Sequence, residues 1–390
     1  MYSTSLLIIL TAIFFGIPAV YYLYLWYMSS KPWNLKIDEK YTPPVTVIIP
    51  TYNEEKTIRF KLLNLNKVEY PKEKIQVILI DDASTDATIQ EVLKFVNEHP
   101  ELNLEIICEK VRRGKSKALN IALKHANHEI IIVSDADTLW SSDILINALP
   151  LLSDPSVGAI TGRQMLFNPQ KSLLSQTEEI YLDIIQEIVK LGQSKIHSTL
   201  IFHGLFSAYR RKFLEKFNLE TDDSGTALDI IQKGARTIYA RKAKCYEISS
   251  ITWKGKVRTK LRRASQLIGI YVRCLKLFLR RRLLLPFRVA IPEIFIYLVN
   301  PIIFPLLIVI SFLFFVNHLV YFLYMSIVLF FILAVSPKFR LLCIEALQDN
   351  CILLLALFAY LFKKKFLMWE TLQESRGMLN EEILKRENLI

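Results

Sequence analysis

Two long apolar stretches, one near each end of the chain, most constrain how this sequence can fold. Residues 5–28 and 294–335 carry no Asp, Glu, Lys or Arg, whereas residues 31–288 have the mixed composition of a globular protein. About 20 consecutive apolar residues are enough for a helix to cross a bilayer. The sequence therefore predicts a soluble module held between membrane anchors.

Positive charge gathers beside these stretches. A dense basic group lies in residues 254–288, immediately before the second stretch, and Lys31, Lys36 and Lys40 follow the first. Such clusters mark the cytoplasmic flanks of membrane helices. We therefore expect a multi-pass protein of the cell membrane (inner or plasma membrane) whose residues 31–288 are cytoplasmic.

The sequence disfavours a nucleic-acid partner, a zinc site and a disulfide framework. The basic residues lack the interleaved aromatic pattern of a nucleic-acid-binding module, so no nucleic-acid partner is expected. The five cysteines are widely scattered, with no C-x-x-C pair, so neither a zinc site nor a disulfide framework is predicted.

The hydropathy pattern divides the chain into five parts. They are an N-terminal transmembrane anchor (1–30), a cytoplasmic α/β domain (31–266), an amphipathic interface helix (267–290), a C-terminal transmembrane region of two or three helices (291–365) and a tail (366–390). A break at Asn317-His318 predicts a hairpin. Polar residues from Glu345 to Asn350 interrupt the last apolar stretch, which we interpret as re-entrant or interfacial, because a third span would place three lysines (363–365) outside.

The soluble part alternates between strand and helix patterns. Short β-branched apolar runs, typical of strands buried on both faces, lie at 45–49, 75–80, 104–108 and 129–134, with helix patterns at 54–65, 86–97 and 116–124 between them. This alternation predicts an α/β fold with an open, mostly parallel sheet. Ligands bind outside the carboxyl ends of such strands, where Asp81, Asp82, Asp135 and Asp137 stand.

The first two strand ends carry recognisable motifs. Pro50-Thr51-Tyr52-Asn53-Glu54 and Asp81-Asp82-Ala83-Ser84-Thr85-Asp86 resemble the P-x-Y-N-E and D-D-x-S-x-D motifs of family 2 glycosyltransferases, which have the GT-A fold. The resemblance implies a nucleotide-sugar donor (a UDP- or GDP-sugar) whose nucleoside contacts Pro50, Tyr52, Glu54 and Asp81. Carboxylates accept hydrogen bonds from base N–H groups and ribose hydroxyls. Helix capping is the alternative for these acids, and it is favoured for Asp86.

A glycine and a lysine precede the third helix pattern. Gly114, Ala118 and Asn120 match a G-x-x-x-A-x-N segment of the same family, and Lys115 would stand at a helix N-terminus that can attract a diphosphate. A solvated charge run is the alternative. A phosphate-binding P-loop is excluded, because Glu109 occupies the position of its first glycine.

Asp135 and Asp137 stand two positions apart after the fourth strand, where they can share one hard cation. Oxygen ligands suit Mg²⁺ or Mn²⁺ bridging the oxygens of a diphosphate, so Asp135 is also expected at the nucleotide. Such an ion would act as a Lewis acid on the departing nucleoside diphosphate. Alternatively, the two acids cap a helix predicted over residues 141–149.

Thr221-Asp222-Asp223 resembles the T/E-E/D-D segment that supplies the general base in this family. The resemblance makes Asp223 the base of an inverting transfer, with Asp222 beside it. Two exposed turn residues are the alternative, and an acceptor phosphate would need no base. His203, before Gly204, resembles a segment that borders the acceptor pocket, and we expect a structural role for it.

The end of the domain departs from the family pattern. Processive members carry Q-x-x-R-W, whereas this chain has Lys260-Leu261-Arg262-Arg263-Ala264. Arg262 and Arg263 are expected at the donor diphosphate or a lipid phosphate, with lipid headgroup contact as an equal alternative. We expect a hexosyl- or N-acetylhexosaminyltransferase, inverting and metal-dependent, whose acceptor is a polyprenyl phosphate or lipid-linked saccharide. The alternatives are a processive polysaccharide synthase and a non-catalytic membrane scaffold.

Overall fold

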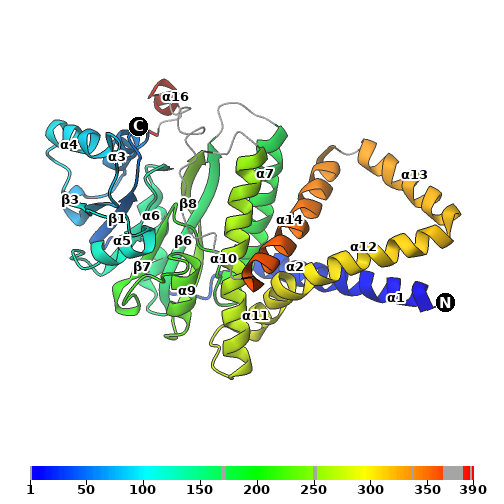
Figure 1. The fold of residues 1–390 in the computed structure, drawn as a ribbon. Helices are drawn as coiled ribbons and strands as arrows, with labels where there is room; N and C mark the ends of the chain where they lie inside the picture. Colours follow the sequence, from blue (N-terminus) through cyan, green and yellow to red (C-terminus); the bar gives the residue numbers. More distant parts are fainter. Residues whose placement is uncertain (1, 168–172, 249–252, 336, 363–380, 387–388) are drawn as a thin grey trace.

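A computed structural model describes residues 2–167, 173–248, 253–335, 337–362, 381–386 and 389–390 of the 390-residue chain. Within them lies an eight-stranded sheet of order β3-β2-β1-β4-β7-β6-β8-β5. Figure 1 shows the sheet with short helices around it, the long helices α7 (Leu173–Ile184) and α10 (Trp253–Leu279) next to it, and the apolar helices beyond them.

The first half of the sheet is parallel. β1 (Val45–Thr51) pairs with β2 (Ile75–Asp81) and β4 (Ile130–Val133), and β3 (Leu104–Cys108) pairs with β2. Every residue of β1, β2 and β4 is buried, as expected for strands covered on both faces. The helices between them are α3 (Ile58–Asn66), α4 (Thr88–Glu98) and α5 (Lys115–Ala122). The predicted α/β alternation is confirmed.

The second half of the sheet mixes strand directions. β7 (Ser207–Arg210) runs antiparallel to β4 and to β6 (Val157–Phe167), while β8 (Arg236–Ile248) runs parallel to β6 and antiparallel to β5 (Thr138–Trp140). The helix predicted over 141–149 is shorter, because α6 (Ile144–Ala148) gives way to a 3-10 helix, Leu149–Ser153, with Pro150 near its start. Proline lacks the N–H that would continue an α-helix.

The long helices differ from the predicted interface helix. α7 continues through a π-helical turn, η4 (Ile185–Lys190), into α8 (Leu191–Ile196). α10 begins at Trp253, well before the predicted residue 267, and ends at Leu279, so that α11 (Phe287–Ile294) is separate. Two of the basic residues in the first half of α10, Lys256 and Lys260, form ion pairs with another helix, which a hydropathy pattern does not reveal.

Those ion pairs dock α14 (Pro337–Leu361) on α10. Lys256 pairs with Glu345, and Lys260 pairs with Glu345 at 2.5 Å and with Asp349 at 2.7 Å. Glu345 is 3% exposed and Lys256 is 2% exposed. Charges persist in such a place only when they are paired. The acids that interrupt the last apolar stretch therefore face the protein.

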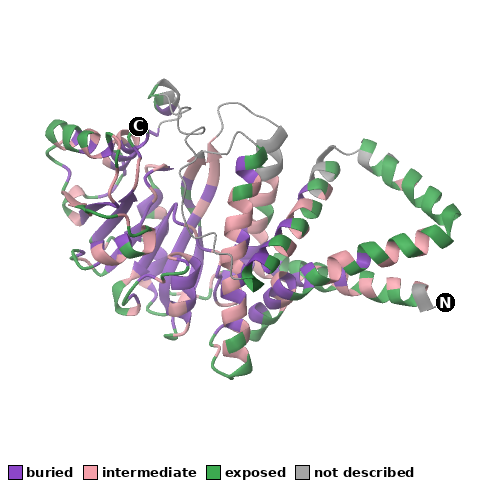
Figure 2. Ribbon diagram, viewed as in Figure 1, coloured by how far each residue is buried: buried purple, intermediate pink, exposed green. Residues whose placement is uncertain are grey.

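The other apolar residues also form helices. They are α1 (Tyr2–Thr11), a π-helical turn η1 (Ala12–Gly16) and α2 (Ile17–Ser29) at one end, and α12 (Asn300–Asn317) and α13 (Leu319–Val335) at the other. By length and composition, Thr4–Ser29, Phe287–Asn317 and Cys343–Leu361 could each cross a membrane. Exposed residues dominate α12 and α13, whereas the sheet is buried (Figure 2). The predicted break at Asn317-His318 separates α12 from α13.

The end of the chain returns to the soluble domain. Leu384 of α16 (Glu381–Arg386), Leu389 and Ile390 are buried in one cluster with Leu139 of β5. The Asn64 side chain donates to the Leu389 carbonyl at 2.6 Å. Residues 363–365 and 366–380 of the predicted membrane region and tail lie outside the described residues.

A buried hydrogen-bond network, the Gln193 network, ties the N-terminal helix to the rest. The Gln193 side chain of α8 donates to the Tyr21 hydroxyl of α2 at 3.2 Å and to Glu293 of α11 at 2.5 Å. The Tyr271 hydroxyl of α10 also donates to Glu293, at 2.9 Å. Because buried polar groups are costly to leave unpaired, the network fixes how these four helices meet.

Gly192, next to Gln193, provides a test of this packing. A Cβ atom at Gly192 would lie 2.5 Å from the Leu25 carbonyl oxygen of α2, whereas one at Gly16 would meet nothing within 4 Å. Alanine is favoured over glycine in helices by about 1 kcal/mol, but overpacking costs about 1–3 kcal/mol. We expect Gly192→Ala to lower the thermal unfolding midpoint in detergent, and Gly16→Ala to leave it unchanged or raise it. Equal midpoints would contradict the close contact.

Candidate active site

The loops that follow β1 and β2 are held together at the edge of the sheet. Thr51 and Asp81, the last residues of these strands, are paired in register, and the Thr51 hydroxyl donates to the Asp81 carboxylate at 3.1 Å. Asp81 also accepts from the Ser84 backbone N–H at 2.8 Å and is 3% exposed. Its carboxylate therefore shapes the loop at the strand end where the sequence places the nucleoside.

Tyr52 is the partly exposed member of the residues predicted at the nucleoside. The guanidinium of Arg112 lies 3.7 Å from the centroid of its ring. Pro50 is buried inside β1, and Glu54 is 1% exposed, with its carboxylate accepting from the Thr57 hydroxyl at 2.7 Å. A stacked aromatic and guanidinium pair offers flat surfaces for a nucleobase. The motifs do not indicate Arg112, which reaches Tyr52 from the loop before α5.

Asp82 and Asp86 organise backbone. Asp82 accepts from the N–H groups of Arg113 at 2.7 Å and Gly114 at 2.8 Å, and Asp86 accepts from a backbone N–H at the start of α4 at 3.0 Å. This hydrogen bond agrees with the capping role favoured for Asp86, although the N-cap residue of α4 is Ala87. Gly114 has a φ of +89°, which glycine adopts readily, and this turn leads into α5 at Lys115.

Lys115 joins two groups of acids to which the sequence gives different roles. Its ammonium lies 2.6 Å from Asp135 and 3.1 Å from Asp222. Burial works to lower the pKa of Lys115, but the two carboxylates raise it above its ordinary value, so the side chain stays charged. A Cβ atom on Gly204 would lie 2.6 Å from a carboxylate oxygen of Asp135, so the ion pair of Lys115 and Asp135 occupies space that this glycine leaves open. Lys115 is therefore part of the site and not of a solvated charge run.

The loop after β4 is fixed from the protein interior. The Asp135 N–H donates to the Gly204 carbonyl at 2.9 Å, and the preceding Ser134 hydroxyl accepts from Lys61 at 2.7 Å. The Lys61 ammonium lies 4.2 Å from the centroid of the Trp140 ring, and burial lowers the pKa of Lys61 to about 7. No local pattern indicates Lys61, because it contacts a loop 73 residues later.

Asp135 and Asp137 are partly exposed, and neither caps α6, which begins after Asp143. Carboxylate oxygens are the ligands that Mg²⁺ and Mn²⁺ prefer. Among the described residues, no group of three or more His, Cys, Asp or Glu side chains is arranged to hold a metal ion. Two carboxylates fit a site that a bound diphosphate completes with its own oxygens.

Asp222 and Asp223 precede α9 (Ser224–Ile231). Asp223 is the N-cap and accepts from the Ser224 N–H at 2.6 Å. Burial and then the adjacent Asp222 carboxylate raise the pKa of Asp223 to about 6, while Lys115 opposes the rise. A carboxylate with such a pKa can accept a proton near neutral pH. Asp222 instead pairs with Lys115, so the two neighbouring carboxylates have different partners.

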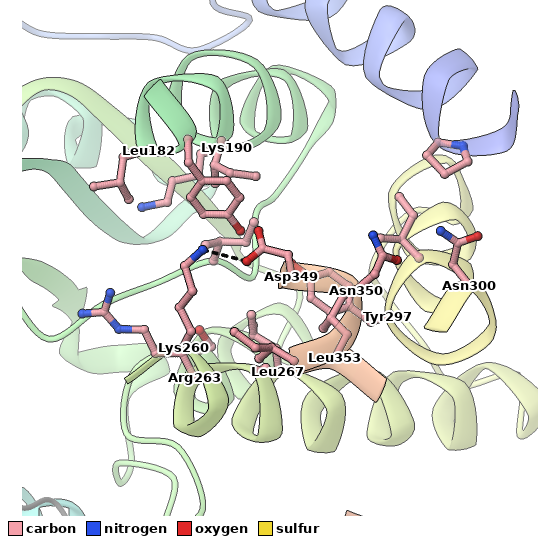
Figure 3. A pocket seen from close by; sticks show the side chains of 18 of the residues that line it. Leu182, Lys190, Lys260, Arg263, Leu267, Tyr297, Asn300, Asp349, Asn350 and Leu353 are labelled. Carbon is pink, nitrogen blue, oxygen red and sulfur yellow. Dashed lines mark hydrogen bonds and ion pairs between the residues drawn. The ribbon is translucent and has the colours of Figure 1, made fainter. Parts of the chain in front are cut away.

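A cavity of about 560 Å³ reaches Asp223 from between the helices (Figure 3). Its wall is largely apolar and includes Phe14, Leu267 and Leu353, from η1, α10 and α14. Its polar lining residues include Lys190, His203, Lys260, Arg263 and Asp349. The soluble domain and the apolar helices therefore build this cavity together.

The two arginines predicted at a phosphate differ in their contacts. Arg263 lines the cavity and donates to Glu247 of β8 at 2.8 and 3.1 Å. Burial lowers the pKa of Arg262, whose charge interacts with those of Asp223 and Asp135. Arg262 is therefore the one placed toward the predicted acids.

His203 is held by the strand beside it. Its Nε2 donates to the Gly162 carbonyl at 3.0 Å, and burial lowers the pKa of His203 well below its ordinary value, so the ring is neutral. Its Nδ1 is buried without a hydrogen-bond partner among the described residues. The bond to Gly162 agrees with the structural role expected for His203.

Comparison with known proteins agrees with this architecture. Residues 43–265 match the family described as Glycosyltransferase like family 2. In fold, the chain is similar to the mannosyltransferase PcManGT from Pyrobaculum calidifontis, solved in complex with GDP-Man and Mn²⁺. The likeness covers 93% of this chain and 100% of that one, with a TM-score of 0.76 and 30% sequence identity. The expected GT-A fold is confirmed.

Two curated relatives share a smaller part of the chain. The poly-beta-1,6-N-acetyl-D-glucosamine synthase of Staphylococcus epidermidis is 25% identical over 264 residues, 64% of this chain and 62% of the synthase. The probable glycosyltransferase YdaM of Bacillus subtilis is 29% identical over 238 residues, 59% of this chain and 57% of YdaM. The chain spans about three fifths of the length of these relatives. The family match over residues 43–265 shows that the chain belongs to glycosyltransferase family 2.

Proposed function

We propose that the enzyme transfers one hexosyl or N-acetylhexosaminyl group from a UDP- or GDP-sugar to a lipid-borne acceptor, with inversion at the anomeric carbon. The apolar cavity that reaches Asp223 between the soluble domain and the apolar helices carries this proposal. A cavity in that place suits an acceptor with a hydrocarbon chain. A polyprenyl phosphate or a lipid-linked saccharide has this chemistry.

The donor is proposed to bind at the ends of β1, β2 and β4. The complex of PcManGT with GDP-Man and Mn²⁺ supports a nucleotide-sugar donor and a divalent cation for this chain. Tyr52 and Arg112 would face the base, while Asp135 and Asp137 would hold Mg²⁺ or Mn²⁺. When bound, such a cation neutralises the charge that grows on the departing diphosphate.

Asp223 is proposed as the general base. The acceptor hydroxyl gives its proton to the Asp223 carboxylate while its oxygen bonds to the anomeric carbon, and the bond from that carbon to the diphosphate breaks. Attack on the face opposite the leaving group inverts the configuration. Lys115 keeps Asp222 and Asp135 together, which sets the acceptor side beside the donor loop.

A processive polysaccharide synthase is the second candidate, because the S. epidermidis relative bears that name. A growing polymer would need to pass the ion pair of Lys260 and Asp349, which lies in the cavity lining (Figure 3). The chain also lacks Q-x-x-R-W at this place. Single transfer is therefore favoured.

Labelled UDP- and GDP-sugars, incubated with the purified protein and membrane lipids, test the proposed function. Single transfer to a lipid places one labelled sugar per acceptor in the organic phase. A ladder of water-soluble products would instead favour the synthase.

We also propose that the soluble domain faces the cytoplasm. The basic residues beside the apolar helices support this orientation. Because Leu384, Leu389 and Ile390 pack on the soluble domain, the helices between residues 287 and 381 would cross the membrane an even number of times. The candidate spans Phe287–Asn317 and Cys343–Leu361 are compatible with two crossings.

Cysteine labelling tests this orientation. Cys108 is exposed on the soluble domain. In intact cells, a membrane-impermeant maleimide should not label Cys108, and permeabilised cells should show a signal that is absent from the Cys108→Ser variant. A Cys108-dependent signal in intact cells would place the domain outside.

Removal of the metal ion should stop transfer. We expect excess chelator to abolish activity and added Mg²⁺ or Mn²⁺ to restore it. Asp137→Asn should lower turnover by orders of magnitude, because the lost charge weakens the bridge from metal to diphosphate. Asp143→Asn, in an exposed acid beyond the same loop, is the matched control and should keep activity. Full turnover in chelator would refute the metal assignment.

Asp223→Asn should separate chemistry from donor binding. Asparagine caps helices as well as aspartate, so α9 should stay folded. A lost general base lowers turnover about 10²–10⁴-fold, while donor affinity should stay within a few-fold of wild type. In the wild type, turnover should fall as the pH drops through about 6, because the base works only when deprotonated. A loss of less than about tenfold would point to Asp222 or to an acceptor phosphate.

A further inference from the structure

One cation in the cavity lacks an acidic partner. Lys190 is 3% exposed and lines the cavity, and among the described residues its ammonium makes no hydrogen bond or ion pair. The centroid of the Tyr239 ring lies 5.6 Å from this ammonium. By contrast, Lys260 is paired with two acids and Arg263 with Glu247. An isolated ammonium in such a place is costly unless an anion joins it.

The position of Lys190 in its helix points to binding. Lys190 ends the π-helical turn η4, and such turns are frequent at functional sites. The cavity is lined by two more π-helical turns, through Phe14 of η1 and Tyr297 of η6 (Phe295–Val299). Three helices from distant parts of the chain therefore depart from α-helical geometry at the same cavity. This coincidence marks the cavity as a built site.

The charges near Lys190 favour an anion. Figure 3 shows Lys190 and Arg263 pointing toward the same side of the cavity, away from Asp349. Burial lowers the pKa of Lys190 to about 7 and the charge of Arg263 acts in the same direction, while Cys245 and Asp223 oppose the fall. A phosphate between these side chains would reverse both effects. The apolar wall on the far side would hold a hydrocarbon chain attached to that phosphate.

We propose that Lys190 binds the phosphate or diphosphate that joins the saccharide of a lipid-linked acceptor to its lipid, and thereby selects phosphate-bearing acceptors. A hydroxyl of that saccharide remains the attacking group, so Asp223 keeps its proposed role as the base. This inference rests on the proposed function. The same chemistry could come from the diphosphate of the donor, but Asp135 and Asp137, the proposed donor ligands, do not line this cavity, whereas Asp223 does. The acceptor phosphate is therefore the assigned ligand.

A matched pair of probes tests the assignment. Geranylgeranyl phosphate and geranylgeraniol differ only in the phosphate, and their binding to the full chain is measured in a phosphate-free detergent. The wild type should bind the phosphate about 10- to 100-fold more tightly than the alcohol, because charge-assisted hydrogen bonds have that strength. Lys190→Met and Lys190→Gln should reduce the ratio to about twofold, and Lys190→Arg should keep most of it.

Two controls and one further outcome decide whether Lys190 binds the phosphate. Lys195→Met, in a lysine of α8 outside the cavity lining, should leave the ratio unchanged. UDP and GDP should bind every variant within about twofold of wild type, and this binding also shows that each variant is folded. Weaker nucleotide binding by both Lys190→Met and Lys190→Gln would overturn the assignment, because Lys190 would then contact the donor. If the Lys190 variants lost affinity for geranylgeranyl phosphate and for geranylgeraniol equally, Lys190 would have only a packing role.

The proposed function and this inference fail in different ways. If the wild type glycosylates soluble saccharides and neither binds nor glycosylates any lipid, the lipid acceptor is wrong and the assignment of Lys190 falls with it. If the wild type glycosylates lipids and Lys190→Met keeps the preference for phosphate, only the assignment of Lys190 is wrong.

Discussion

The ion pairs of Lys115 with Asp135 and Asp222 are the contact on which the site depends. They join the end of β4, the start of α5 and the segment before α9, so one ammonium holds the loop proposed for the donor next to the acids proposed for the acceptor side. Asp222 also raises the pKa of Asp223. A cation bound at Asp135 would compete with Lys115 for the same carboxylate, so the proposed donor binding would be electrostatically linked to the acidity of Asp223.

The parallel half of the fold could be predicted because its signals are local. A strand buried on both faces is a continuous apolar run, and Asp81 and Asp135 follow such runs directly. β6 and β8 gave no such signal, since their pairing includes register shifts and outer residues that are partly exposed. Lys61 and Arg112 could not be found either, because a fully buried lysine and a partly exposed loop arginine gain their roles from residues distant in sequence.

The apolar helices also combine features that the local sequence predicts with features that it does not. Apolar length alone predicts where α2 and α12 lie, and the break at Asn317 is visible in the sequence. Glu345 in α14, however, reads as an interruption until Lys256 and Lys260 of α10 are placed against it. A hydropathy profile scores each segment separately, so it does not reveal that opposite charges on two helices pair with each other. This is why the predicted interface helix began too late.

The helix formed by η4 and α8 contacts both α2 and the cavity proposed for the acceptor. Gln186 and Lys190 line the cavity, while Gly192 and Gln193, on the following turn, contact α2 and the Gln193 network. A shift of α2 would therefore move the cavity wall. The loops proposed for the donor stand on β1, β2 and β4, whose described residues are not in the hydrophobic cluster that contains Tyr21 and Leu25 of α2. Donor geometry follows from short motifs at strand ends, and acceptor geometry follows from packing between helices. The motifs consequently locate the donor side of such an enzyme, and its acceptor must be argued from the cavity.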